Sequence, residues 1–172
     1  FANPDIHERT TAKEIWEQSN HNIDGLVTGV GTGGTVTGCA RFLKKVNPNC
    51  KIFAVEPAKS AVISGEKAGS HLIQGIGAGF IPKVLNTQLI DEIIKIDDDE
   101  AFYYGRLLAR KEGLLSGISS GAALAATIKI GQRKELVNKR LIVILPSFGE
   151  RYLSTAMFES NTLIEAREDG YL

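Results

Sequence analysis

A short glycine-rich segment is the part of this sequence best suited to bind a ligand. Residues 29–34 read Gly-Val-Gly-Thr-Gly-Gly, with four glycines in six positions, and Thr35 follows directly. Glycines let the backbone approach a ligand closely, and a helix that begins there points free N–H groups and the positive end of its dipole at an anion. Thr32 and Thr35 add two hydroxyl donors. The segment therefore predicts a loop that binds a phosphate group.

The same residues fit two kinds of phosphate ligand. Gly29, Gly31 and Gly34 match the G-x-G-x-x-G fingerprint of dinucleotide-binding folds, and Glu56 stands where such a fold places its ribose-binding acid. A single phosphate monoester would instead be enclosed by the tight loop 31–35. Spacing alone leaves both an NAD-binding dehydrogenase domain and a smaller phosphate site open.

The segments around this loop predict an α/β fold with a parallel sheet. An apolar strand, the glycine loop, a helix with Val36, Ala40 and Leu43 on one face, and a second strand form a βαβ unit. A helix is expected to open at Thr11, which has capping-box spacing to Glu14. We expect strands at 24–29, 51–55, 89–96 and 140–145, helices at 11–16, 35–46, 97–113 and 121–130 (the last capped by Ser119 or Ser120), and loop at 56–79.

Composition excludes several classes of protein. The 172 residues include 20 Lys or Arg and 20 Asp or Glu, so no nucleic-acid partner is expected. No stretch of about 18 apolar residues occurs, so no membrane span is expected. Cys39 and Cys50 are expected to be reduced and packed, which favours the cytoplasm or an organellar stroma or matrix. His7, His21 and His71 do not cluster, so we expect surface side chains and no metal site. The chain begins without Met, and we expect it to be part of a longer protein.

Five ordered motifs, beginning with the glycine loop, resemble one known family. Residues 28–38 resemble the phosphate loop of the cysteine synthase and cystathionine β-synthase family of pyridoxal-phosphate (PLP) enzymes. The other four motifs follow in the family's order at 54–57, 74–82, 112–122 and 145–155. Within the last, Pro-Ser-Phe-Gly-Glu-Arg-Tyr-Leu-Ser-Thr is similar to the cysteine synthase branch, and cystathionine β-synthases usually differ there. The resemblance makes a cystathionine β-synthase-like enzyme the second choice and the dehydrogenase domain the third.

The resemblance implies a fold, a cofactor and a reaction. The fold would be the C-terminal, larger domain of a fold-type II PLP enzyme, three-layered with a mostly parallel sheet, over residues 1–158, with 159–172 as a peripheral tail. The reaction would be cysteine synthesis from O-acetylserine and sulfide, which suits a neutral hydroxyl at the pyridine nitrogen. The implied site consists of Gly31, Thr32, Gly33, Gly34 and Thr35 at the PLP phosphate, Ser147 at the pyridine nitrogen, and Gly75, Ile76 and Gly77 on the substrate side.

The family's catalytic residues have no counterpart in this chain. The cofactor-bearing lysine of the family lies in a Ser-x-Lys motif of the N-terminal domain, and the substrate loop reads Thr-Ser-Gly-Asn; neither motif occurs here. We therefore expect the chain alone to be inactive. Expected partners are its own N-terminal domain, a second copy in a homodimer, an amino-acid substrate and the C-terminal tail of serine acetyltransferase. A catalytically silent protein that only binds this tail is a non-enzymatic alternative.

Overall fold

The sheet confirms the expected α/β class. In the computed structural model, which describes residues 2–158, four strands pair in parallel in the order β3-β2-β1-β4. Gly25 at the start of β1 lies opposite Lys51 of β2 and Leu141 of β4, so these strands begin at the same edge. The strands are β1 (Gly25–Gly29), β2 (Lys51–Pro57), β3 (Glu92–Ile96) and β4 (Leu141–Val143).

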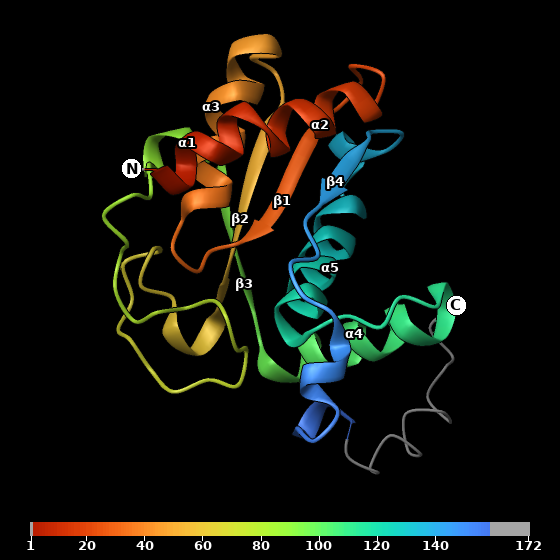
Figure 1. Ribbon diagram of the computed structural model, residues 1–172. Coiled ribbons are helices and arrows are strands. Elements are labelled where there is room, and N and C mark those ends of the chain that lie inside the picture. Colours follow the sequence, from red (N-terminus) through yellow and green to blue (C-terminus); the bar gives the residue numbers. More distant parts are fainter. Residues whose placement is uncertain (1, 159–172) are drawn as a thin grey trace.

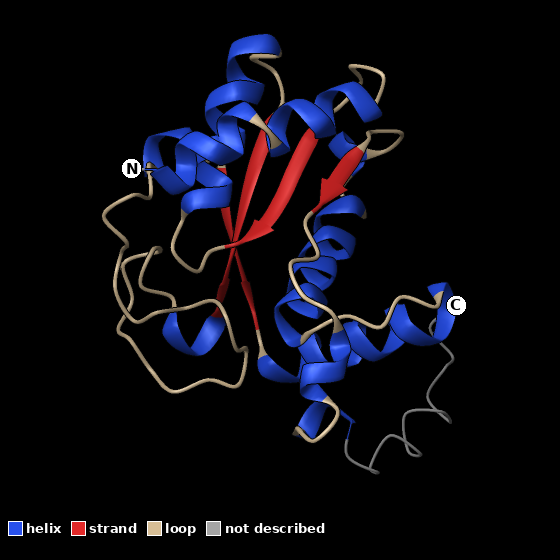
Figure 2. Cartoon of the chain, in the orientation of Figure 1, coloured by secondary structure: helices blue, strands red, loops and turns tan. Residues whose placement is uncertain are grey.

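Helices cover both faces of this sheet, which gives the three layers expected from the family resemblance (Figures 1 and 2). One layer contains α1 (Ala2–Arg9), α2 (Thr11–Gln18) and α3 (Gly34–Val46). The other contains α4 (Asp98–Glu112) and α5 (Ile118–Gly131). Short 3₁₀ turns complete the described chain at η1 (Ala58–Ser60), η2 (Thr87–Leu89), η3 (Lys134–Leu136), η4 (Gly149–Tyr152) and η5 (Ala156–Phe158).

A hydrophobic core lies between the sheet and each helical layer, because successive strand residues point to opposite faces of the sheet. Along β2, Phe53 and Val55 join the core beneath α4 and α5, whereas Ile52 and Ala54 join the core beneath α1 to α3. Both faces are apolar, as is typical of a parallel sheet covered by helices on each side. The sheet can therefore hold its carboxyl-end loops in a fixed arrangement.

The chain order places a topological switch point beside β1. From β1 the chain passes through α3 to β2 and then to β3, moving toward one edge, whereas β4 pairs on the other side of β1. In open parallel sheets, ligands bind outside the carboxyl ends of the strands where the order reverses in this way. The loops that follow Gly29 and Val143 are therefore the expected ligand site.

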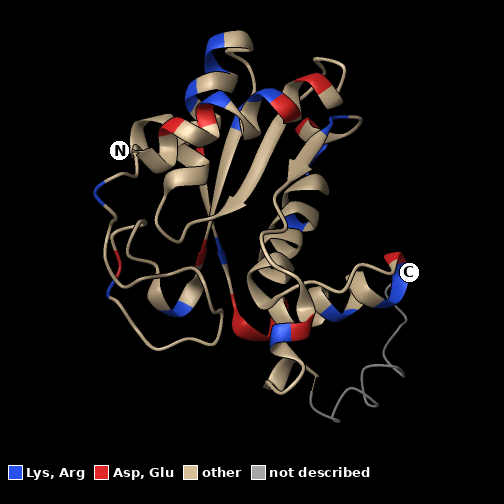
Figure 3. Cartoon of the chain, in the orientation of Figure 1, with Lys and Arg blue, Asp and Glu red and all other residues tan. Residues whose placement is uncertain are grey.

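Charged side chains are interspersed on the outside, with both signs mixed over α1 to α3 and along α4 (Figure 3). Residues 25–40, from β1 through the glycine loop into α3, contain no Lys, Arg, Asp or Glu. The same is true of residues 141–149, which comprise β4 and the segment after it. Across the described chain, none of the helices combines the length and apolar character that crossing a membrane requires.

Several expected boundaries are wrong at the ends of helices. α1 was not expected at all. α2 begins at Thr11 as expected, but Thr10 is its N-cap, so Thr11 does not occupy the position that the proposed capping box requires. Ser119 and Ser120 are not caps: both are buried inside the first turn of α5, and Gly117 is the N-cap.

Two strands are shorter than their apolar patterns predict. Residues 87–89 form the turn η2 because the Asn86 side chain accepts a hydrogen bond from the N–H of Gln88, at 3.1 Å. At β4, Ile144 still donates its N–H to the carbonyl of Val27, at 3.0 Å, and Pro146 then removes a donor. The predicted tail at 159–172 lies outside the described residues.

Candidate functional site

A cavity of about 280 Å³ lies at the carboxyl ends of β1 and β4, at the switch point. It brings together the glycine loop, the substrate-side segment and Ser147, which are far apart in the sequence. Of the residues implied by the family resemblance, Gly77 alone is outside the lining. The lining residues are Thr28, Gly29, Gly31, Thr32, Gly33, Gly34, Thr35, Val36, Gly75, Ile76, Ser119, Ile144, Pro146, Ser147 and Tyr152.

The glycine loop has the backbone geometry of an anion-binding turn. Gly33 caps α3 in a left-handed conformation, with φ of 82°, which a side chain would strain. A Cβ atom on Gly31 would lie 2.5 Å from the carbonyl oxygen of Gly75, so only glycine fits there. The first-turn N–H groups of α3 have no helical acceptors, and they carry the positive end of the helix dipole. These donors lie beside the hydroxyl of Thr35.

Thr35 is held by a residue that the sequence did not reveal. The Nε2 atom of His7 lies 3.2 Å from Thr35 Oγ1, and its Nδ1 atom lies 2.9 Å from Thr11 Oγ1. His7 is half-buried between α1 and α3, so its expected place on the free surface is wrong. No local spacing signals this contact, because the two partners are 28 positions apart.

Ser60, Ser116 and Ser147 carry the buried hydroxyls that have no hydrogen-bond partner among the described residues, and of these only Ser147 lines the cavity. An unpaired buried hydroxyl is unfavourable by about 1–3 kcal/mol, so a native site of this kind normally has a partner. The pyridine nitrogen of PLP, a planar acceptor, fits this requirement. Ser120 donates weakly to the backbone carbonyl of Ser147, at 3.4 Å, while Ser119 lines the cavity itself.

The lining residues named above include no charged side chain. An anion in this cavity would be held by neutral N–H and O–H donors and by the dipole of α3.

Glu56 is not available to bind a ribose. Its side chain is 1% exposed, and its carboxylate accepts hydrogen bonds from the N–H of Ile63 at 2.9 Å and from Ser64. The Ser64 backbone N–H and hydroxyl donate at 3.1 and 2.6 Å. Since this carboxylate caps a turn of its own chain, the dinucleotide interpretation of the fingerprint is wrong.

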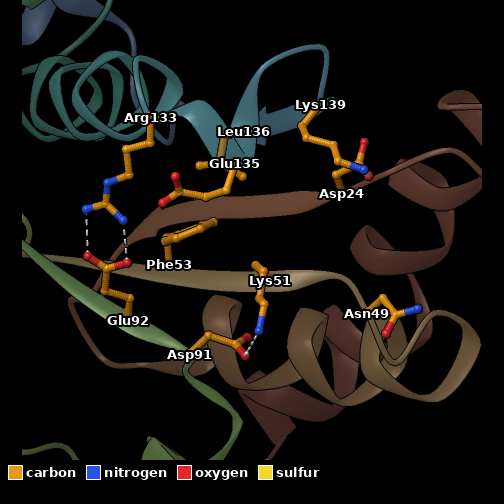
Figure 4. A pocket seen from close by; sticks show the side chains of 10 residues that line it. All are labelled: Asp24, Asn49, Lys51, Phe53, Asp91, Glu92, Arg133, Glu135, Leu136 and Lys139. Carbon is orange, nitrogen blue, oxygen red and sulfur yellow. Dashed lines mark hydrogen bonds and ion pairs between the residues drawn. The ribbon is translucent and has the colours of Figure 1, made fainter.

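Two other hollows differ from this cavity. One, of about 530 Å³, is largely apolar, shares Gly31, Thr32, Gly75 and Ile76 with the cavity, and opens past Phe80. The other, of about 370 Å³, lies at the amino ends of the strands (Figure 4). Its basic side chains are already paired with acidic ones, and that end of a parallel sheet is not where ligands bind.

The cysteines have no redox arrangement. Burial raises the pKa of the Cys39 thiol to about 12 and that of Cys50 to about 11, so both are neutral and unreactive near physiological pH. Both are free and packed, as expected. Within residues 2–158, no three His, Cys, Asp or Glu side chains gather closely enough to hold a metal ion.

Comparison with known proteins assigns the family. Residues 1–147 match the family described as pyridoxal-phosphate dependent enzyme. The chain belongs to this family. PLP carries a phosphate group, and the cavity has a glycine turn with anion-binding geometry in its lining together with the unpaired hydroxyl of Ser147.

The similar PLP-dependent enzymes include several cysteine synthases. The chain is 52% identical to cysteine synthase of Buchnera aphidicola subsp. Acyrthosiphon pisum over 165 residues, covering 91% of this chain and 52% of that protein. Cysteine synthase A of Escherichia coli is 51% identical, with 91% and 51% covered. The chain therefore spans about half the length of these relatives.

Solved structures agree with this family. The cysteine synthase of Entamoeba histolytica superimposes with a TM-score of 0.89 at 45% identity, covering 91% of this chain and 46% of that one. An O-ureido-L-serine synthase superimposes with a TM-score of 0.87 at 38% identity, covering 92% and 50%. The parallel sheet flanked by helices is thus the fold of fold-type II PLP enzymes.

Proposed function

We propose that this chain forms the PLP-binding C-terminal domain portion of a cysteine synthase. The complete enzyme would make cysteine from O-acetylserine and sulfide by replacing the group on the β-carbon. The observation that carries the proposal is the cavity in which the uncharged phosphate loop and the unpaired Ser147 hydroxyl meet. Similarity to proteins named cysteine synthase supports this choice over a cystathionine β-synthase-like enzyme.

Each group of residues has a role that follows from its chemistry. Gly31 to Gly34 offer backbone N–H groups to the phosphate, and Thr32 and Thr35 offer hydroxyl hydrogens. Ser147 offers a neutral hydroxyl to the pyridine nitrogen, which leaves the ring largely unprotonated. Bound PLP withdraws electrons from the α-carbon of an amino acid, and an unprotonated ring does so weakly, which suits elimination of a good leaving group such as acetate.

The substrate side would be formed by Gly75, Ile76 and Gly77. Gly75 and Ile76 line both the cavity and the apolar hollow beside it, so an amino acid entering from that hollow would meet them first. The absence of a side chain at Gly75 leaves room for the α-carboxylate and β-carbon.

This chain would bind the cofactor without completing the reaction. A PLP enzyme needs a lysine to hold the cofactor and to move the α-proton, and no residue in this chain matches that lysine motif. The lysine would come from an N-terminal domain. Further partners in this proposal are a second copy of the enzyme and the C-terminal tail of serine acetyltransferase, in the cytoplasm or an organellar stroma or matrix.

Two measurements test the proposal. Equilibrium dialysis of this chain against PLP is expected to show saturable binding, with competition by inorganic phosphate and none by NAD. The complete protein, expressed from the parent gene with the sequence upstream of Phe1, is expected to form cysteine from O-acetylserine and sulfide. NAD binding without PLP binding, or a complete protein without sulfide-dependent turnover, would overturn it.

A further inference from the structure

The imidazole of His71 makes two hydrogen bonds that determine which nitrogen carries its proton. The backbone N–H of Ile73 donates to Nδ1, at 3.2 Å, so Nδ1 must be unprotonated. Nε2 lies 2.9 Å from the carbonyl oxygen of Gly77, and only an N–H can satisfy that contact. His71 therefore bridges residues 73 and 77 as a neutral Nε2–H imidazole. A doubly protonated ring would set Nδ1–H against the N–H of Ile73.

A second hydrogen bond links Gly77 to Val30, the residue directly before the phosphate loop. The N–H of Gly77 donates to the carbonyl of Val30, at 3.1 Å, and the N–H of Val30 donates to Val55 of β2, at 3.0 Å. Val30 directly precedes Gly31, whose Cα faces the carbonyl of Gly75 at the distance that excludes a side chain. One imidazole thus fixes a loop that is itself hydrogen-bonded to the anion-binding turn.

The segment from 61 to 86 contains no helix or strand, so individual hydrogen bonds and buried side chains determine its path. Its glycines 75, 77 and 79 all have positive φ, between 68° and 93°, a conformation that few residues hold unaided. Near its middle, the N–H of Leu72 donates to Asp98 at 2.8 Å, and the same carboxylate accepts from Lys59 at 2.7 Å. His71, the residue directly before Leu72, adds the hydrogen bonds to Ile73 and Gly77.

His71 acts on the site from outside. It lines neither the cavity nor the adjoining apolar hollow, so it has no direct route to a ligand. It is half-buried rather than free on the surface, which corrects the expectation from sequence. A Cβ atom built on Gly77 would lie 2.7 Å from Nε2 and 2.5 Å from Pro57, so the ring is closely packed.

We propose that His71 is a positioning residue whose neutral Nε2–H imidazole closes the 71–77 loop and holds Gly75 and Ile76 in register with the phosphate loop. The closure itself follows from the contacts of this chain. Its consequence for PLP and the amino-acid substrate rests on the proposed function.

The test compares the wild-type chain with His71→Ala, His71→Gln and the control His21→Ala. His71→Ala loses both bonds, whereas the amide of His71→Gln can still donate to Gly77. His21 is exposed and pairs only with nearby groups of its own segment, Glu17 at 3.0 Å and the Trp16 ring. Each protein is examined by amide hydrogen exchange, by equilibrium dialysis with PLP, and by ¹⁵N NMR of the histidine rings.

The expected results separate positioning from general stability. In His71→Ala, exchange at the Ile73 and Gly77 amides rises about tenfold and PLP binding weakens about threefold to tenfold. His71→Gln recovers most of the Gly77 protection, and His21→Ala matches wild type. The ¹⁵N spectrum of the wild-type chain shows His71 as the Nε2–H tautomer.

Each failure has its own meaning. A charged or Nδ1–H His71 in the wild-type spectrum overturns the proposal even if no variant folds. Wild-type exchange and wild-type PLP affinity in His71→Ala also overturn it. If the Gly77 amide is protected from exchange in the wild-type chain and loses that protection in His71→Ala, but the wild-type chain binds no PLP, the proposed function is refuted and the loop closure stands.

Discussion

The hydroxyl oxygen of Thr35 lies 3.2 Å from Nε2 of His7, which joins the first turn of α3 to α1. Thr35 has one hydroxyl hydrogen, and a phosphate can use it only if the hydroxyl accepts from His7 rather than donating to it. This direction follows if Thr11 donates to Nδ1 of His7, at 2.9 Å, and leaves the ring hydrogen on Nε2. The arrangement predicts that His7 orients a phosphate-binding hydroxyl without touching the phosphate.

Replacing His7 therefore should weaken cofactor binding. In His7→Ala, Thr35 is free to turn away from the phosphate, and PLP affinity is expected to fall about threefold to tenfold. Equilibrium dialysis measures the affinity, and urea unfolding checks that the fold is retained. Lys13→Ala, an exposed change on α2, is the matched control. Equal PLP affinity in the two variants would contradict the role assigned to His7.

A methyl group on Gly31 should disrupt the loop itself. Its Cβ would lie 2.5 Å from the carbonyl oxygen of Gly75, a backbone atom that cannot move without shifting the substrate-side segment. Gly31→Ala is expected to weaken PLP binding by about tenfold or more, since overpacking of this kind costs about 1–3 kcal/mol. Gly131→Ala is the control, because no heavy atom lies within 4 Å of a Cβ there. Wild-type affinity in Gly31→Ala would mean that the loop does not enclose the phosphate.

The sequence predicted those parts of the fold and site that depend on neighbouring residues. The glycine loop, the strand before it and α3 follow from local pattern, whereas Ser147 became a candidate only through the family resemblance of residues 145–155. α1 was missed because its segment has no apolar periodicity and contains Pro4. This helix packs closely on α3 at Gly38, where a side chain would collide with the backbone of Pro4 and with His7.

The remaining errors come from contacts that residue type and spacing do not reveal. Ser119 and Ser120 have the residue type of helix caps, but α5 begins earlier because Gly117 donates its N–H to the carbonyl of Ser147, at 2.9 Å. Glu56 has the spacing of a ribose ligand, and nothing local shows that its carboxylate turns toward Ile63 and Ser64. Spacing locates a side chain along the chain but does not show which way it points.

The three hydrogen bonds to Glu56 lead to a stability prediction. Glu56→Gln replaces one accepting oxygen with a donor NH₂ group, which opposes the donors of Ile63 or Ser64. We expect the free energy of unfolding to fall by about 1–3 kcal/mol, measured with urea. Glu66→Gln, an exposed change in the same loop, should cost less than about 1 kcal/mol. Equal stability of the two variants would refute this account, and NAD binding lost specifically in Glu56→Gln would restore the dinucleotide alternative.

The ion pair between Glu92 and Arg133 should make stability depend on pH (Figure 4). Both guanidinium NH groups donate to the carboxylate at 2.7 Å. These hydrogen bonds hold the pKa of Glu92 below its ordinary value, against the opposing effect of burial. A carboxyl whose pKa is lower in the folded state stabilises the fold fully above its unfolded pKa, and this contribution is lost as pH falls through the folded pKa.

Glu92→Gln tests this linkage. The side chain of Arg133 is 34% exposed and that of Glu92 is 38% exposed, so solvent screening should keep the loss of unfolding free energy below about 1 kcal/mol near neutral pH. The difference from wild type should shrink as the wild-type carboxyl becomes protonated in acid, and added salt should reduce it at neutral pH. Urea unfolding over a pH series measures it, with Glu135→Gln as an exposed neighbouring control. A difference that stays constant or grows in acid would show that Glu92 acts through packing rather than through its charge.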